Sequence, residues 1–394
     1  MNQPVVAAAC RTPIGLRHGG LSGWHPADLA GAVLAALARC SGLDPADVDE
    51  VVLGCATLVG DQGCNLARSA VLAAGWPESV PATTVDRQGA ASLQAVAVAA
   101  QAVASGHAEV VVAAGVELST TTPAGSWVEP GTRPFGPGVV RRYAERGGLI
   151  PPGVAAERLA ERAGLDRPAL DAWADRSRRR ARRAGAAGAF TAELVAVPAR
   201  RWDRERRVVW DPGTEVEADE GPGHDPGDAA TCPPLFVPGG AVTAANRAPV
   251  ADGAAAVLVM APERVAAAGP GRPLARVVAT AGAAVDPRET FSAAAPATTR
   301  LLDRAGVGPG EVERFEVDET FACVPLAWMA ELGIDGERVN PAGGAIALGH
   351  PPGASGARMV TTLCHGLAGT GALGLAVLGG VGGVATAVLV VGSG

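Results

Sequence analysis

A glycine-rich segment from Asn340 to Arg358 holds the residues best suited to chemistry in this sequence. It reads Asn-Pro-Ala-Gly-Gly-Ala-Ile-Ala-Leu-Gly-His-Pro-Pro-Gly-Ala-Ser-Gly-Ala-Arg, with His350 near its centre. Clustered glycines let the backbone approach a ligand closely. His350 stands just before an expected helix start, where backbone N–H groups favour negative charge. It could therefore donate a hydrogen bond to a developing oxyanion or move a proton.

Two acidic residues, Asp318 and Glu319, follow a predicted strand at 315–317 and are the candidate acid–base partners of His350. If Asp318 faces the imidazole, its negative charge favours the imidazolium form. The structural alternative is that loop N–H groups satisfy both carboxylates. The residues of the glycine-rich segment that we expect to contact a substrate are Asn340, Gly343, Gly344, Gly349, Gly353 and Ser355.

The elements that must position these residues alternate between short apolar runs and helical patterns, which is typical of an α/β fold. The expected strands are 51–54, 109–114, 255–260, 315–317 and 373–378, and the expected helices are 27–39, 93–105, 167–184 and 297–305. Residues 42–52 and 306–316 match as helix end, proline turn, acidic turn and strand, and residues 89–92 are echoed by 352–356. Two copies favour gene duplication and two similar halves, with reuse of common turn chemistry as the alternative.

Residues 120–242 differ from the flanking sequence because they are rich in Gly, Pro and Arg. We expect an inserted loop domain that lies over a pocket. The predicted domains are an N-terminal half (1–119 plus 243–265), the loop domain (120–242) and a C-terminal half (266–394). The arginines at 176–183 are interpreted as a solvated helix face, with contact to a nucleotide phosphate or an acidic partner as the alternative.

Composition excludes several functional classes. Of the 394 residues, 48% are hydrophobic and 19% charged, and the net charge is −7, which indicates a globular protein and argues against nucleic-acid binding. The seven cysteines include no CxxC pair, so we expect no metal site and free thiols in a cytoplasmic protein. The apolar run 371–391 contains several glycines, which suit buried strands better than a membrane span.

In order along the chain, these motifs resemble those of the thiolase family. Residues 11–15 resemble its opening strand and turn, 115–119 the strand end before an inserted loop domain, and 243–256 the segment returning from it. Residues 316–322 resemble its Asn-Glu-Ala-Phe motif, and the segment around His350 resembles its second signature. The resemblance implies a thiolase fold, a duplicated five-layer αβαβα sandwich with an inserted loop domain. It also implies a homodimer or dimer of dimers, a coenzyme A thioester as substrate and no required cofactor.

The sequence departs from the family at the catalytic positions. The family uses one cysteine to carry the acyl group and a second to handle the proton at the α-carbon. Gly89 and Gly379 stand at these two positions, and Asp318 replaces the family's asparagine. Of the four catalytic side chains, only His350 matches. Cys323 is the one candidate for a substitute thiol, and its alternative is a buried apolar filler.

The expected coenzyme A contacts are weakened too, because Ala248 stands where the family has a serine and Gly223 where it has an arginine. Three hypotheses follow. The first is an enzyme that acts on an acyl thioester, by acyl transfer or by making or breaking a C–C bond, without a cysteine acyl-enzyme. The second is an inactive subunit that supports an active thiolase-fold partner or another enzyme, and the third is a binding protein without chemistry. We favour the enzyme because the loop around His350 is intact.

Overall fold

The computed structural model describes residues 3–128, 131–203, 205–206, 208–224, 227, 229–268 and 272–394. Its main sheet has the strand order β12-β13-β14-β11-β1-β10-β5-β3-β4, with the short β2 paired to β10. The strands of the first half are β1 (Val5–Arg11), β2 (Gly15–Leu16), β3 (Glu50–Gly54), β4 (Ala82–Val85), β5 (Val110–Leu118) and β10 (Ala251–Met260). Those of the second half are β11 (Ala275–Ala284), β12 (Val312–Val317), β13 (Leu373–Gly380) and β14 (Val384–Gly392).

The two half-sheets meet at a short seam between β1 and β11. Val5 pairs with Arg276 and Val6 with Ala275, whereas β1 and β10 pair along most of their length. Every residue of β5 and β10 is buried, as expected for strands covered on both faces. The brevity of the seam means that helices, more than strand pairing, hold the halves together.

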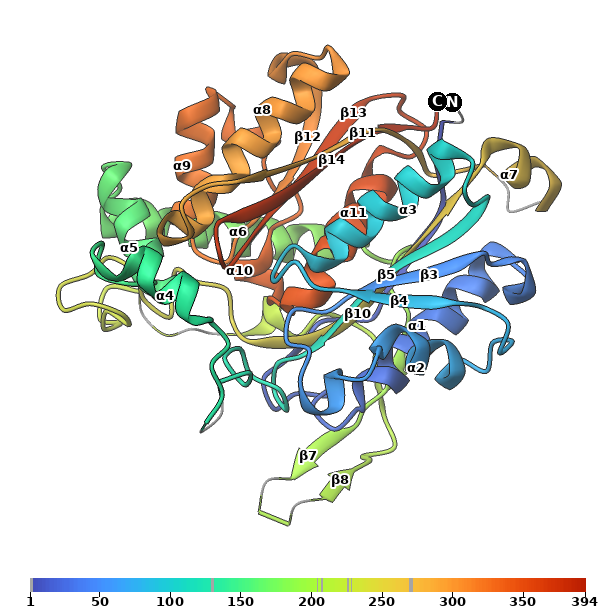
Figure 1. The fold of residues 1–394 in the computed structure, drawn as a ribbon, viewed down its shortest axis with the longest axis horizontal. Coiled ribbons are helices and arrows are strands. Elements are labelled where there is room, and N and C mark those ends of the chain that lie inside the picture. The colour runs from blue at the N-terminus through green and yellow to red at the C-terminus, as the bar shows by residue number, and fades with distance from the viewer. Residues whose placement is uncertain are drawn as a thin grey trace.

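Helices form three further layers around the half-sheets (Figure 1). In the middle, α3 (Ala91–Ser105) and α11 (Pro352–Leu367) pack on each other and on strands of both halves. The outer face of the first half carries α1 (Pro26–Ser41) and α2 (Leu66–Ala73), and that of the second carries α8 (Ala294–Ala305) and α9 (Cys323–Leu332). Three apolar cores fill the spaces between these layers. The predicted five-layer αβαβα sandwich is therefore observed.

The internal repeat is visible in the backbone. α1 ends at Gly42 with φ +69°, and α8 ends at Gly306 with φ +66°, a left-handed conformation that favours glycine. Each end is followed by a 3-10 turn and then by β3 or β12. In each half a loop then leads into the middle helix, so that Gly89 lies two residues before α3 and His350 two residues before α11.

The segment 120–242 contains α4 (Pro137–Ala144), α5 (Pro152–Arg162) and α6 (Arg167–Ala186), together with two small hairpins. The hairpins are β6 (Val197–Pro198) with β9 (Glu215–Val216), and β7 (Arg201–Asp203) with β8 (Val208–Trp210); the second projects from the body in Figure 1. The domain boundaries stay a prediction. Along the chain, α7 (Pro262–Ala268) follows β10 and precedes β11, and the short α10 (Ala345–Leu348) precedes α11.

The arginines of α6 are not simply a solvated face, as we had interpreted them. Arg180 is buried and donates to the carbonyl oxygen of Val339 at 2.6 Å, and Arg178 donates to that of Ala245. Arg180 thus fastens α6 to the second half and Arg178 fastens it to the returning segment, while Arg179, Arg182 and Arg183 remain exposed. Within the described part of the chain, no helix is long and apolar enough to cross a membrane.

Candidate active site

A cavity of about 320 Å³ opens where the loops ahead of α3 and α11 meet the end of β13. His350, Gly89 and Gly379 all lie in its wall, so the structure brings together three positions that are far apart in the sequence. Its remaining described lining is Arg17, Ala56, Thr57, Gln88, Ser119, Pro123, Ala124, Trp127, Pro152, Arg247, Ala248, Pro249, Val250, Phe291, Thr320, Phe321, Pro352, Gly380 and Val381. No cysteine is among these lining residues.

His350 is held rigidly in the loop between α10 and α11. Its backbone N–H donates to the carbonyl oxygen of Pro249 at 3.1 Å, and its Nδ1 lies 2.9 Å from the Ser355 hydroxyl. The preceding Gly349 has φ +110°, and a Cβ there would lie 2.7 Å from the side chain of Ile14. Only glycine fits this turn, which explains why the histidine follows one.

Thr320 links His350 to Asp318. The Thr320 hydroxyl lies 2.6 Å from Asp318 Oδ1 and 3.3 Å from His350 Nε2. If this hydroxyl donates to the carboxylate, it can only accept from the ring, so Nε2 carries the proton and Nδ1 is an acceptor. The single proton of the Ser355 hydroxyl then has two acceptors at 2.9 Å, Nδ1 and the carbonyl oxygen of Pro351. In this arrangement the neutral imidazole presents an N–H donor on the side of Thr320, which itself lines the cavity.

Burial and, to a smaller extent, the charge of Arg358 together lower the pKa of His350 to about 4. The ring is therefore neutral at pH 7. We had expected that an Asp318 facing the ring would favour imidazolium. Instead, Thr320 separates the two groups, and desolvation dominates over the carboxylate.

Asp318 is fully buried at the end of β12, where its N–H donates to the Val377 carbonyl oxygen at 3.0 Å. Oδ1 also accepts from the N–H of Thr320 at 2.8 Å, whereas Oδ2 has no hydrogen-bond partner. Burial raises the pKa of Asp318, and the hydrogen bonds from Thr320 offset part of the rise. A Cβ on Gly379 would lie 3.3 Å from Oδ2, with no other atom outside its chain neighbours within 4 Å. Asp318 is not among the lining residues of the cavity, but its unpaired, buried oxygen lies next to Gly379, which is.

Gly89 and Gly379 touch through their backbones. An ideal Cβ on Gly89 would lie 2.9 Å from the carbonyl oxygen of Gly379. Gln88 just before it has φ +50°, which turns the chain into α3. The two positions that the sequence analysis assigned to the family's cysteines are therefore adjacent.

Cys323 lies away from this cavity, contrary to its candidacy as a substitute thiol. It is the first residue of α9, is fully buried, and its Sγ lies 3.4 Å from the Ala156 carbonyl oxygen. Burial raises the pKa of the Cys323 thiol far above its ordinary value. A thiol that stays protonated and faces a carbonyl in the core is a poor nucleophile.

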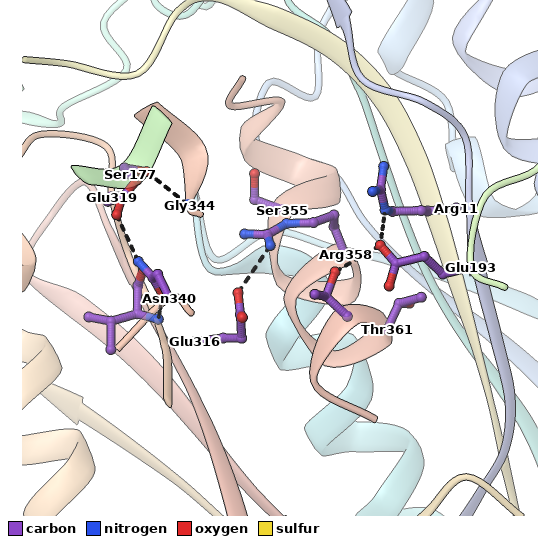
Figure 2. A network of polar contacts seen from close by, with 12 residues as sticks. Arg11, Ser177, Glu193, Glu316, Glu319, Asn340, Gly344, Ser355, Arg358 and Thr361 are labelled. Carbon is purple, nitrogen blue, oxygen red and sulfur yellow. Dashed lines mark hydrogen bonds and ion pairs between the residues drawn. The ribbon is translucent and has the colours of Figure 1, made fainter. Parts of the chain in front are cut away.

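Glu319 also faces away from the cavity, although we had proposed it as an acid–base residue. Its carboxylate accepts from the side chains of Trp173, Ser177 and Asn340 and from the N–H of Ile346, at 2.7–3.1 Å. Figure 2 shows it between Asn340 and Ser177. With four donors on two oxygens, Glu319 ties α6 to the glycine-rich loop.

None of the six predicted substrate-contacting residues lines the cavity, contrary to our expectation, and most of them support the loop. Asn340 bonds to both backbone groups of Val317. A Cβ on Gly343 would lie 2.7 Å from the side chain of Ala181, and one on Gly344 would lie 2.4 Å from the carboxylate of Glu319. A Cβ on Gly353 would lie 2.4 Å from a carbonyl oxygen of β5. These glycines allow close packing of backbone on backbone. Of the predicted set, only Ser355 touches the imidazole.

Sequence reasoning missed three residues of the site, Thr320, Arg17 and Arg247, which all line the cavity. Thr320 could have been found from its place two residues after Asp318. Arg247 lies within the returning segment, one residue before the noted Ala248, and only its charge marks it. The described residues contain no cluster of His, Cys, Asp and Glu able to hold a metal ion.

Comparison with known proteins gives consistent matches over the whole chain. The profile of the thiolase N-terminal domain matches residues 4–263, and that of the thiolase C-terminal domain matches residues 271–392. The steroid 3-ketoacyl-CoA thiolase FadA6 of Mycobacterium tuberculosis is 37% identical, over 92% of this chain and 87% of its own. An acetyl-CoA acetyltransferase of Pseudomonas aeruginosa is 39% identical, over 93% of both chains.

Two solved structures are similar over their full length. Human mitochondrial 3-ketoacyl-CoA thiolase superposes with a TM-score of 0.87 at 28% identity, covering 100% of this chain and 99% of its own. The Acat5 thiolase of Ascaris suum, solved in complex with coenzyme A, superposes with a TM-score of 0.85 at 32% identity, covering 99% and 100%.

Proposed function

Because this chain belongs to the thiolase family, we propose that it acts on acyl thioesters of coenzyme A, by transferring an acyl group or by making or breaking a C–C bond. The family uses coenzyme A thioesters and requires no cofactor. The observation that carries the proposal is the cavity wall shared by His350, Gly89 and Gly379. This wall keeps the histidine at the meeting point of the two halves.

We propose further that the reaction passes through no cysteine acyl-enzyme. Support comes from glycine at both thiol positions, from the absence of cysteine among the described lining residues, and from the burial of Cys323. Thioester exchange by the ping-pong route requires a sulfur nucleophile within reach of the carbonyl carbon. Binding, orientation and oxyanion stabilisation remain available without one.

In the proposed mechanism, His350 stabilises an enolate. Its Nε2–H would donate to the thioester oxygen, whose negative charge grows as the α-carbon loses a proton. Asp318 Oδ2 would accept that proton, since it lies next to Gly379 and its raised pKa strengthens it as a base. The electron pair of the C–H bond then attacks the carbonyl carbon of an acyl donor. The departing thiolate takes the proton from Asp318, which completes the cycle.

The test is exchange of α-protons for deuterium, followed by mass spectrometry of acetyl-CoA incubated with the protein in heavy water. Wild type should catalyse exchange, Asp318→Asn should abolish it, and His350→Gln should slow it by about 10²-fold, as expected for one oxyanion donor. Exchange that survives in Asp318→Asn would remove the carboxylate from the mechanism. A mass increase on any cysteine of the wild type would show a covalent route.

The competing candidate is a subunit that supports an active partner, favoured by the same absence of thiols from the cavity wall. Size-exclusion chromatography with light scattering separates the two. The enzyme proposal predicts a homodimer or dimer of dimers in the cytoplasm, with activity in the purified protein. A stable complex with a cysteine-bearing thiolase, and activity only in that complex, would favour the subunit.

A further inference from the structure

Two arginines, Arg17 and Arg247, lie in the wall of the same cavity. Arg247 is half-buried; its Nη1 donates to the carbonyl oxygen of Ala248 at 3.1 Å, while its buried Nε has no hydrogen-bond partner. Arg17 has an exposed side chain that forms no ion pair with a described residue. Neither guanidinium serves the acyl-thioester chemistry proposed above.

The backbone places both arginines close to the imidazole. The segment 247–250 begins at Arg247, which forms a β-bridge with Phe321. Within this segment, the carbonyl oxygen of Pro249 accepts a hydrogen bond from the N–H of His350 at 3.1 Å. The carbonyl oxygen of Val250 accepts one from the N–H of Arg17 at 3.0 Å. One extended segment thus joins the two guanidinium-bearing residues to the loop that carries His350.

The charges of this wall are unbalanced. Among its described residues there is no aspartate or glutamate, and most of the others are apolar or small. Burial lowers the pKa of Arg247, and the nearby charge of Arg17 lowers it further. A half-buried guanidinium with an unpaired N–H beside a second positive charge is costly unless an anion accompanies it.

We propose that the acyl group of the substrate carries a carboxylate, held by Arg17 and Arg247 while the thioester faces His350. Guanidinium forks match a carboxylate in two-pronged geometry, which sets both affinity and orientation. This inference names the substrate class of the proposed function and rests on it for the position of the thioester. The phosphates of coenzyme A share the same anionic chemistry. They are separated from the thioester by the whole pantetheine arm, whereas both arginines are joined to His350 through one short segment.

The experiment compares succinyl-CoA with butyryl-CoA by isothermal titration calorimetry, because these have four acyl carbons each and differ in the terminal carboxylate. Wild type should bind succinyl-CoA about 10- to 100-fold more tightly, the range expected for a desolvated charge pair. In Arg247→Met, which keeps an apolar stem, this ratio should fall to near one, and Arg17→Met should lower it in the same direction. Arg300→Met is the matched control: Arg300 lines a separate cavity, where it donates to the Gly282 carbonyl oxygen, and its loss should leave the ratio unchanged.

The outcomes distinguish a carboxylate on the acyl group from a phosphate of coenzyme A as the anion that the arginines bind. If Arg247→Met weakens succinyl-CoA, butyryl-CoA and free coenzyme A equally, the arginines bind phosphate and the inference is overturned. Equal binding of both thioesters by wild type overturns it as well. Thermal unfolding of each variant shows whether the fold is kept. Since binding is measured without turnover, a protein that discriminates but fails to exchange α-protons would retain this inference and lose the proposed function.

Discussion

A side chain on Gly89 would place its Cβ 2.9 Å from the carbonyl oxygen of Gly379. That separation is shorter than a carbon–oxygen contact allows, so any side chain at position 89 would require one of the two backbones to shift. The main chain around Gly89 is therefore fitted to glycine.

A cysteine placed at position 89 should not become acylated. In Gly89→Cys we expect a loss of about 1–3 kcal/mol in the free energy of unfolding, because the new Cβ overpacks the contact with Gly379. Gly379→Cys is the comparison: its Cβ would have only Asp318 Oδ2 nearby, at 3.3 Å, so it should cost less. Urea unfolding measures both. Stoichiometric acetylation of Gly89→Cys by acetyl-CoA, seen by mass spectrometry, would contradict the expectation.

The pKa of His350 predicts how stability changes with pH. It is about 4 in the folded chain, below the ordinary 6.5, so the unfolded chain takes up the proton first as the pH falls. The stability that depends on neutral His350 should be complete above pH 6.5 and lost progressively towards pH 4. Thermal unfolding should show that wild type is more stable than His350→Gln at pH 7 and that this difference in stability is smaller at pH 5. A histidine titration by NMR with a pKa near 6.5 for His350 would contradict this.

The hydroxyl of Thr320 should matter more than its methyl group. Thr320→Val removes the donor to Asp318 Oδ1 and the contact with His350 Nε2, and should lower the free energy of unfolding by about 1–3 kcal/mol. Thr320→Ser keeps the hydroxyl and should recover most of that loss. Deuterium exchange into acetyl-CoA should follow the same order. Equal exchange by the Val and Ser variants would show that the link has no chemical role.

Glu319 should behave as a structural residue. Glu319→Gln turns an acceptor of four hydrogen bonds into a group that also donates, so one or more of its buried neighbours loses its partner. We expect a loss of about 1–3 kcal/mol for each group left unsatisfied. Ser177→Ala removes a single donor and should cost less. If the Glu319→Gln protein is as stable as wild type but cannot exchange α-protons, Glu319 takes part in catalysis and this prediction is wrong.

Cysteine reactivity tests the burial of Cys323. Cys40 and Cys64 are exposed, whereas Cys323 is fully buried and its thiol pKa is raised. Iodoacetamide applied to the native protein should label Cys40 and Cys64 first and leave Cys323 unmodified until denaturant is added. Peptide mass spectrometry reads out each site. Early labelling of Cys323, blocked by acetyl-CoA, would restore it as a candidate nucleophile.

The fold was predictable from the sequence because its signals are local: the turn at Gly42 recurs at Gly306, and apolar runs mark the strands. The resemblance singled out Gly89 and Gly379, and the structure shows that they lie side by side. The roles of Glu319 and Cys323 were not predictable, since they depend on which way a side chain points after long-range packing. Arg247 was missed for the same reason, because no local pattern shows that its guanidinium borders a cavity.

Gly89 and His350 occupy matching places in the repeated halves, each two residues ahead of a middle helix. A substrate bound between these two residues therefore meets an imidazole from one half and only main-chain atoms from the other. A flat enolate in that position would have two inequivalent faces. New bonds should form from one side alone, and any stereocentre made there should have a single handedness.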